Sequence, residues 1–358
     1  MQKLNDYFNY AKDSVQIADI IEDRCVHSNI EVASCKACVD VCPKDAWLLD
    51  DESLLLNESV CDGCGLCSPA CPEGAITINN EILVGQLHDS SIAICACEYT
   101  IPADKEGVLP CINAIGLQEI LTLYERGISK WSVTTLECND CKRGKGVHLS
   151  EKINHLNNSL RKTGKREIRL SLISIREWLE ITQSISEDLS GPKLSRRGFL
   201  EGIISTGFNK RIELQNSVLN KSISFKPPGK LLPKAIESHI WPFLPEIDGH
   251  SCNGCNACVK VCQHQAIQLL KFDTEFSYYI QPEACSGCKM CSDVCELDAV
   301  TVREWKSSVK QQIELTSNNC SSCGNLFHIP KKQSDENAGY CQICRQQNIN
   351  SNLYQILK

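Results

Sequence analysis

Short apolar runs alternate with helical patterns through the middle of the chain. Three of these runs end in cysteine and read SIAICAC, GVLPC and WSVTTLEC, as expected of short buried strands. Between the last two lies INAIGLQEILTLYERG, whose apolar spacing and closing glycine predict a helix. Another helical stretch, HLSEKINHLNNSLRKTG, precedes a further strand, EIRLSLI. Strands that alternate with helices predict a parallel sheet, so we expect an α/β domain over residues 81–185.

The cysteines of this domain follow its predicted strands. Ligands bind at the carboxyl edge of such sheets, so thiols that end successive strands should gather there. Five cysteines are placed in this way: Cys95, Cys97, Cys111, Cys138 and Cys141. We interpret them as a metal site rather than as buried core thiols.

A different pattern repeats on both sides of this domain. A cysteine, three residues, an alanine and an apolar residue recur in CPKDAW, CPEGAI, CQHQAI and CELDAV. Each copy follows a tight cysteine run, and three of the four combinations read C-x2-C-x2-C-x3-C in full. This spacing lets three thiolates surround one face of a cubane cluster, while the fourth cysteine ligates the partner cluster.

The repeat therefore predicts four [4Fe–4S] clusters held by crossed ligand sets. In the first block we expect one set of Cys25, Cys35, Cys38 and Cys71, and a second set of Cys61, Cys64, Cys67 and Cys42. In the second block we expect one set of Cys252, Cys255, Cys258 and Cys295, and another of Cys285, Cys288, Cys291 and Cys262. Zinc knuckles are the alternative, but zinc motifs do not need the third cysteine two residues on.

These motifs resemble the bacterial two-cluster ferredoxin family over about residues 25–80 and 250–303. The resemblance implies two α+β ferredoxin-like domains, 25–80 and 246–306, that flank the α/β domain. The first motif departs from the pattern, because nine residues separate Cys25 from Cys35, and His27 in that loop is an alternative ligand to Cys25. In the second block Gln263 and Glu296 replace proline after the fourth cysteine. An added N–H donor should raise the potential, so we predict that the second pair of clusters is harder to oxidise.

Composition supports bound metal rather than disulfides. The chain has 358 residues, 25 cysteines and a net charge of −7. The odd cysteine count and a polar N-terminus without a signal-like apolar core favour a cytosolic protein. We also expect no membrane span, since no apolar run reaches about 18 residues. Acidic residues dominate 13–81, and basic residues dominate 142–176 and 191–241. The basic stretches lack interleaved aromatics, so we expect a protein partner rather than nucleic acid.

The middle domain resembles the iron–sulfur delta subunit of methyl-viologen-reducing hydrogenases. The order of the cysteines, the strand endings and the basic helix after CNDCKRGKG carry this resemblance, although the cysteine spacings differ. It implies a [2Fe–2S] cluster with four cysteine ligands. We expect Cys95, Cys111, Cys138 and Cys141, with Cys97 as the alternative, because Cys95 is taken as the strand end.

The last cysteines form a different motif. CSSC and CQIC are separated by 17 residues, which is the spacing of a zinc ribbon. We expect one zinc-ribbon-like domain over 315–350 with zinc on Cys320, Cys323, Cys341 and Cys344. A rubredoxin-type iron site is the alternative.

The segment KLSRRGFLEG resembles a twin-arginine export signal in an internal position. We place it in a basic linker over 186–245 and expect a helix over 1–24. With the block that follows, it resembles the ferredoxin that accompanies periplasmic nitrate reductase. That resemblance implies an accessory or maturation factor that binds an exported molybdoenzyme before export.

No sequence motif indicates that the chain catalyses a reaction of its own. There is no complete phosphate-binding loop, no G-x-G-x-x-G after a strand, and no nucleophile or carboxylate pair on a recognisable motif. We therefore expect a cytosolic multi-cluster electron-transfer protein that serves redox enzymes, namely a formate dehydrogenase, a nitrate reductase or a hydrogenase. The maturation factor is the alternative, and a catalytic heterodisulfide-type centre in the middle domain is the third hypothesis.

Overall fold

The chain divides into two units in the computed structural model. The first comprises Met1–Cys25 and Lys36–Lys226, and the second comprises Val26–Cys35 and Pro227–Lys358. The structure describes residues 17–49, 53–78, 80–87, 90–190, 225–234, 240–272, 275–307, 312–333 and 339–347. The twin-arginine-like segment and most of the predicted helix over 1–24 lie outside these residues. The part of 1–24 that is described contains strand β1 (Asp19–Ile20) and a 3-10 turn (Glu22–Arg24) instead of an α-helix.

The first ferredoxin block is built from two short antiparallel strand pairs and two helices. β1 pairs with β4 (Ile76–Thr77), and β2 (Trp47–Leu49) pairs with β3 (Leu54–Leu56). Helices α2 (Ala37–Val41) and α3 (Cys67–Ala70) each end just before the fourth cysteine of a motif. Ala46, Trp47 and Ile76 are buried between these elements, with cysteines around them.

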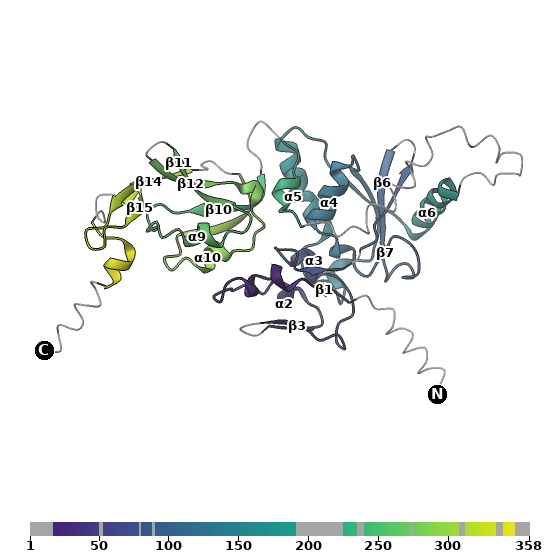
Figure 1. Cartoon of the computed structure of the whole chain (residues 1–358). Helices are drawn as coiled ribbons and strands as arrows, with labels where there is room; N and C mark the ends of the chain where they lie inside the picture. The colour runs from purple at the N-terminus through teal and green to yellow at the C-terminus, as the bar shows by residue number, and fades with distance from the viewer. Residues whose placement is uncertain are drawn as a thin grey trace, which may run out of the picture. The chain divides into compact units, whose positions relative to one another are not determined.

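The middle domain has the expected parallel sheet, with one antiparallel edge. The strand order is β5 (Leu83–Leu87), β6 (Ser90–Cys97), β8 (Lys130–Thr134) and β9 (Arg169–Leu172), and short β7 (Val108–Leu109) also pairs with β6. β6 runs parallel to β7 and β8, and β8 runs parallel to β9, whereas β5 is antiparallel. Helices α4 (Leu117–Glu125) and α5 (Leu149–Lys162) lie on one side of the sheet and α6 (Ile175–Ser190) on the other (Figure 1). Trp178 and Ile185 bury α6 against β6.

The second unit combines the other ferredoxin block with the C-terminal cysteine pairs. β10 (Ile240–Ile247) pairs with β13 (Val300–Ser307), and helices α9 (Ala257–Val261) and α10 (Met290–Asp293) each contain the third cysteine of a run. A four-stranded antiparallel sheet has the order β11 (Ile267–Phe272), β12 (Glu275–Ile280), β14 (Gln312–Asn319) and β15 (Leu326–Pro330). The hairpin that leads to the C-terminal cysteines therefore shares its sheet with the ferredoxin block, where we had expected a separate module.

Among the described residues, no helix has both the length and the apolar character needed to cross a bilayer.

Candidate metal centres

The three uninterrupted cysteine runs share one backbone shape. The second and fourth residues after the first cysteine are left-handed in every run, with φ between 63° and 87°. The residues concerned are Gly63 and Gly65, Gly254 and Asn256, and Gly287 and Lys289. Residues with a Cβ rarely adopt this conformation, so its repetition marks a specific turn around a common centre. The first run, in which nine residues instead of two separate Cys25 from Cys35, departs from it: Lys36 has φ −127°.

The Cys-x3-Ala repeat also has a structural explanation. The residue three positions after the cysteine is left-handed in all four copies: Asp45, Gly74, Gln265 and Asp298. This turn directs the backbone N–H of the alanine at the sulfur, at 3.4 Å for Cys42, 3.2 Å for Cys71, 3.1 Å for Cys262 and 3.2 Å for Cys295. Backbone donors to sulfur stabilise a thiolate that binds metal. Because both blocks have the same donor, this contact does not distinguish the potentials of the two cluster pairs.

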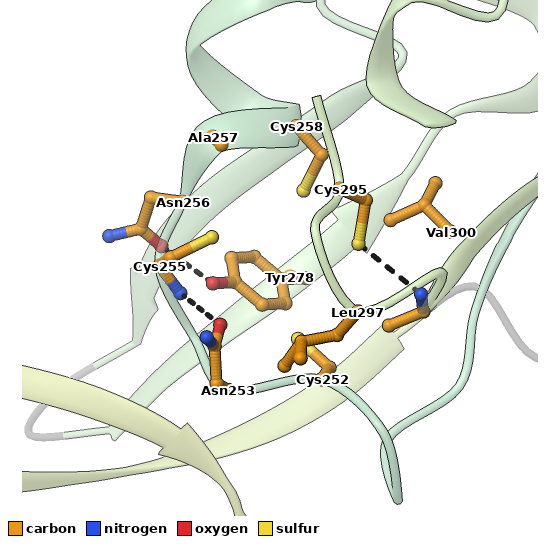
Figure 2. Close-up of a pocket in the computed structure, with 11 residues that line it drawn as sticks. Cys252, Asn253, Cys255, Asn256, Ala257, Cys258, Tyr278, Cys295, Leu297 and Val300 are labelled. Carbon is orange, nitrogen blue, oxygen red and sulfur yellow. Dashed lines mark hydrogen bonds between the residues drawn. The ribbon is translucent and has the colours of Figure 1, made fainter. Parts of the chain in front are cut away.

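One four-thiol site of the second unit appears in Figure 2. Cys252, Cys255, Cys258 and Cys295 line one pocket together with Tyr278. The Tyr278 hydroxyl donates a hydrogen bond to the side-chain oxygen of Asn256 at 2.6 Å. Burial, and then the charges of the other three cysteines, raises the pKa of Cys258 to about 12. Thiols of this kind stay protonated until a cation displaces the proton, so the site suits a bound metal cluster.

The four cysteines of the other ligand set predicted in the second unit also lie close together. Burial raises the pKa of the Cys291 thiol, and the charges of Cys285, Cys288 and Cys262 add to this effect in that order. Cys258 of the first site is the next contributor. The two thiol sets are therefore neighbours, as the crossed ligation of two-cluster ferredoxins requires.

In the first unit, Cys61, Cys64, Cys67 and Cys42 form a comparable group. Burial and the charges of Cys61 and Cys42 raise the pKa of Cys67 to about 11, and Trp47 counteracts part of the shift. Cys38 and Cys71 pack in the same apolar cluster as Cys42. Within the segment Val26–Cys35, which belongs to the second unit, the ring Nε2 of His27 lies 2.8 Å from the carbonyl oxygen of Cys35, so this nitrogen donates a hydrogen bond and is occupied.

Four thiols of the middle domain line one pocket: Cys97, Cys111, Cys138 and Cys141. Burial raises the pKa of Cys111 to about 11, and the charges of the other three thiols contribute. Cys95, which we had expected as a ligand in place of Cys97, does not line this pocket. It lies inside β6, fully buried and paired with Val133, because the strand continues to Cys97 before it ends. The geometry therefore favours Cys97, the alternative that the sequence left open.

Arg143 is a residue of this site that sequence reasoning did not find. Its side chain is buried and carries ion pairs to Asp62 and Glu98 at 2.8 and 2.5 Å. It also donates to the carbonyl oxygen of Pro110 at 2.8 Å. A basic residue two positions after a cysteine gives no signal in the sequence, because its carboxylate partners are 81 and 45 residues away.

The C-terminal pairs form a small, separate group. The sulfur atoms of Cys320, Cys323, Cys341 and Cys344 all lie within 4.8 Å of one another, close enough to hold one metal ion. Backbone N–H groups of Cys323 and Cys341 lower the pKa of Cys320, which favours the thiolate form that binds metal.

Family comparisons support 4Fe–4S binding in both cysteine-rich blocks. A profile described as a 4Fe-4S dicluster domain matches residues 245–302, and 4Fe-4S binding domain profiles match residues 22–45 and 54–77. The chain therefore carries ferredoxin-type 4Fe–4S domains in both blocks. These matches do not include the middle domain or the C-terminal cysteine pairs.

The relatives are ferredoxins and a hydrogenase component. An uncharacterised ferredoxin of Methanocaldococcus jannaschii is 42% identical over 89 residues, which is 25% of this chain and 50% of the relative. Hydrogenase-4 component A of Escherichia coli is 50% identical over 44 residues, 12% of this chain and 22% of the relative. Ferredoxin-1 of Caulobacter vibrioides is 38% identical over 64 residues, 17% of this chain and 50% of the relative. The chain thus matches at most half the length of each.

Proposed function

We propose that the chain is a multi-cluster electron-transfer protein that connects redox enzymes. A bound iron–sulfur cluster supplies one-electron redox chemistry, and the protein supplies ligands, spacing and a dry environment. The proposal uses the four [4Fe–4S] ligand sets expected from the sequence. It adds a two-iron cluster on Cys97, Cys111, Cys138 and Cys141, and one zinc ion on the C-terminal cysteines.

The observation that carries this proposal is the packing between two thiol sets of the first unit. Cys64 of the ferredoxin block and Cys111 of the middle pocket belong to one apolar cluster with Val41 and Leu66. A Cβ on Gly65 would lie only 3.1 Å from the Cβ of Ala114, so the two cysteine-bearing segments are in close contact. Ligand sets this close form a path for single electrons, which an isolated storage or structural site would not need.

The similarity to Hydrogenase-4 component A supports a hydrogenase as partner. The matched segment of Hydrogenase-4 component A is short, so we take the partner class, a hydrogenase or a molybdoenzyme, as part of the proposal. No feature of the described residues favours the maturation role, whose twin-arginine-like segment lies outside them.

Anaerobic purification followed by metal analysis tests the cluster content. Four cubane clusters and one two-iron cluster require about 18 iron atoms per chain, and the C-terminal site requires about one zinc. About 16 iron atoms would remove the middle cluster from the proposal. About one additional iron atom and no zinc would instead assign a rubredoxin-type iron site to the C-terminal cysteines.

Stopped-flow reduction tests the electron-transfer role. The chain should be reduced rapidly by a low-potential donor and reoxidised by the partner enzyme. A chain that stays reduced in the presence of every candidate enzyme, yet binds an immature apoenzyme, would contradict electron transfer and favour maturation.

A further inference from the structure

Arg143 joins four segments that surround two thiol sets of the first unit. Its Nε donates to Asp62, which lies between Cys61 and Cys64 in the ferredoxin block. Its Nη1 donates to Glu98, the residue after Cys97, and to the carbonyl oxygen of Pro110, the residue before Cys111. Arg143 itself follows Cys141 by two residues, and its backbone N–H donates to the Cys141 sulfur at 3.4 Å.

The guanidinium is held on every side. A further bond at 3.3 Å runs to the backbone carbonyl of Asp62, and the Tyr99 ring lies 5.0 Å from the guanidinium carbon. Only 7% of the Arg143 side chain is exposed, compared with 22% for Asp62 and 24% for Glu98. A charge so enclosed acts over a longer range than a surface charge, because water screens it less.

A purely structural ion pair would not require one arginine to bind carboxylates from two different metal-binding segments. The fork of arginine suits two acceptors at once, and here the two carboxylates belong to different metal-binding segments. One side chain therefore fixes the spacing of the two segments and also places a positive charge between them.

We propose that Arg143 is a positioning residue that couples the middle cluster to the ferredoxin cluster of Cys61, Cys64, Cys67 and Cys42. This inference rests on the proposed function, and specifically on a cluster in the middle pocket. The step moves one electron between the two centres: one is oxidised and the other reduced by one electron, and no bond of the protein forms or breaks. The fixed positive charge favours the reduced form of both centres.

The first variant removes the charge and keeps much of the length. In Arg143→Met, two partly buried carboxylates lose their partner and face the two centres, so both midpoint potentials should fall. The four [4Fe–4S] and middle-cluster signals should remain in the electron paramagnetic resonance (EPR) spectrum of the reduced chain, but the magnetic interaction between the two centres should weaken. Arg143→Lys restores the charge without the fork, so it should recover the potentials more fully than the magnetic interaction.

A matched control comes from the same domain. Arg161 makes a comparable two-bond contact with Glu167 at 3.1 and 2.8 Å, but on an exposed surface of α5. Arg161→Met should leave both potentials and the magnetic interaction unchanged. A similar fall in both variants would attribute the effect to general loss of charge and overturn the inference.

Two carboxylate variants give a second test if Arg143→Met loses iron. Asp62→Asn should raise the potential of the ferredoxin centre more than that of the middle centre, and Glu98→Gln should do the reverse. If neither potential moves, or if Arg143→Met changes only one centre, the inference is wrong. A wild-type chain with about 16 iron atoms and no middle-cluster signal would instead contradict the proposed function, so the two failures are distinguishable.

Discussion

At the scale of single residues, the position of one strand end determines which thiol can bind metal. Cys95 and Cys97 both lie on β6, but only Cys97, the last residue of the strand, lines the pocket with Cys111, Cys138 and Cys141. Sequence patterns do not locate the end of a strand to the exact residue. The five thiols and their shared edge could thus be predicted, whereas the choice between two neighbouring thiols could not.

Alanine substitution of these two cysteines should separate a ligand from a core residue. Cys97→Ala should abolish the middle-cluster signal and remove about two iron atoms per chain. Cys95→Ala should retain them and cost about 1 kcal/mol of stability, because it leaves only a small cavity in the sheet. Iron analysis and EPR spectra of both variants check this. Loss of the middle cluster from Cys95→Ala alone would reverse the assignment.

At the scale of elements, left-handed residues shape every uninterrupted cysteine run. Glycines at 63, 254 and 287 are consistent with such turns, and a sequence analysis could have singled them out. Lys289 and Gln265 are left-handed as well, and their residue types do not predict it, whereas Asn256 and Asp298 are residue types that tolerate this conformation. Their conformation follows from the requirement that successive thiols and N–H groups face one centre. The role of the alanine in the repeat, as an N–H donor to sulfur, became visible only in three dimensions.

Gly254 provides the sharpest test of this turn. A Cβ there would overlap the carbonyl oxygen of His328 on β15, and the residue is left-handed with φ 76°. Gly254→Ala should therefore destabilise the Cys252, Cys255, Cys258 and Cys295 site by about 3 kcal/mol, from backbone strain and overpacking together. Gly324 is the control, since its φ is 72° and no atom lies within 4 Å of an added Cβ. Gly324→Ala should cost only about 1 kcal/mol.

Denaturant-induced iron release from the two variants measures this difference. Equal midpoints for Gly254→Ala and Gly324→Ala would show that the close approach to β15 does not support the cluster site.

At the scale of the whole molecule, the C-terminal cysteines and a ferredoxin site depend on one sheet. β14 pairs with β12, and β12 carries Tyr278, which is fully buried beside the Cys252 site. Leu315 of β14 packs in the same apolar cluster as Cys252 and Tyr278. The sequence predicted both metal sites by spacing but not this connection, because strand pairing between 276–279 and 312–315 depends on a long-range register.

Removal of the C-terminal metal should therefore affect a distant cluster. Cys341→Ala should abolish zinc binding, loosen β14 and β15, and accelerate iron loss from the Cys252 site under a chelator. The sites of the first unit should lose iron at the wild-type rate. Asn325→Ala, an exposed position in the same hairpin, should leave both zinc and iron unchanged. An unchanged rate of iron loss in Cys341→Ala would mean that the sheet is stable without the metal.

The shared sheet also sets an order of events during synthesis. Translation produces the loop of Cys252, Cys255 and Cys258 before β14 and β15, so this loop leaves the ribosome without the strand that covers Gly254. Domains fold as their segments emerge, N-terminal first. The clusters of the first block can be inserted into a chain that is still growing. The Cys252 site, in contrast, reaches its final shape only after strands β14 and β15 have been made and have paired.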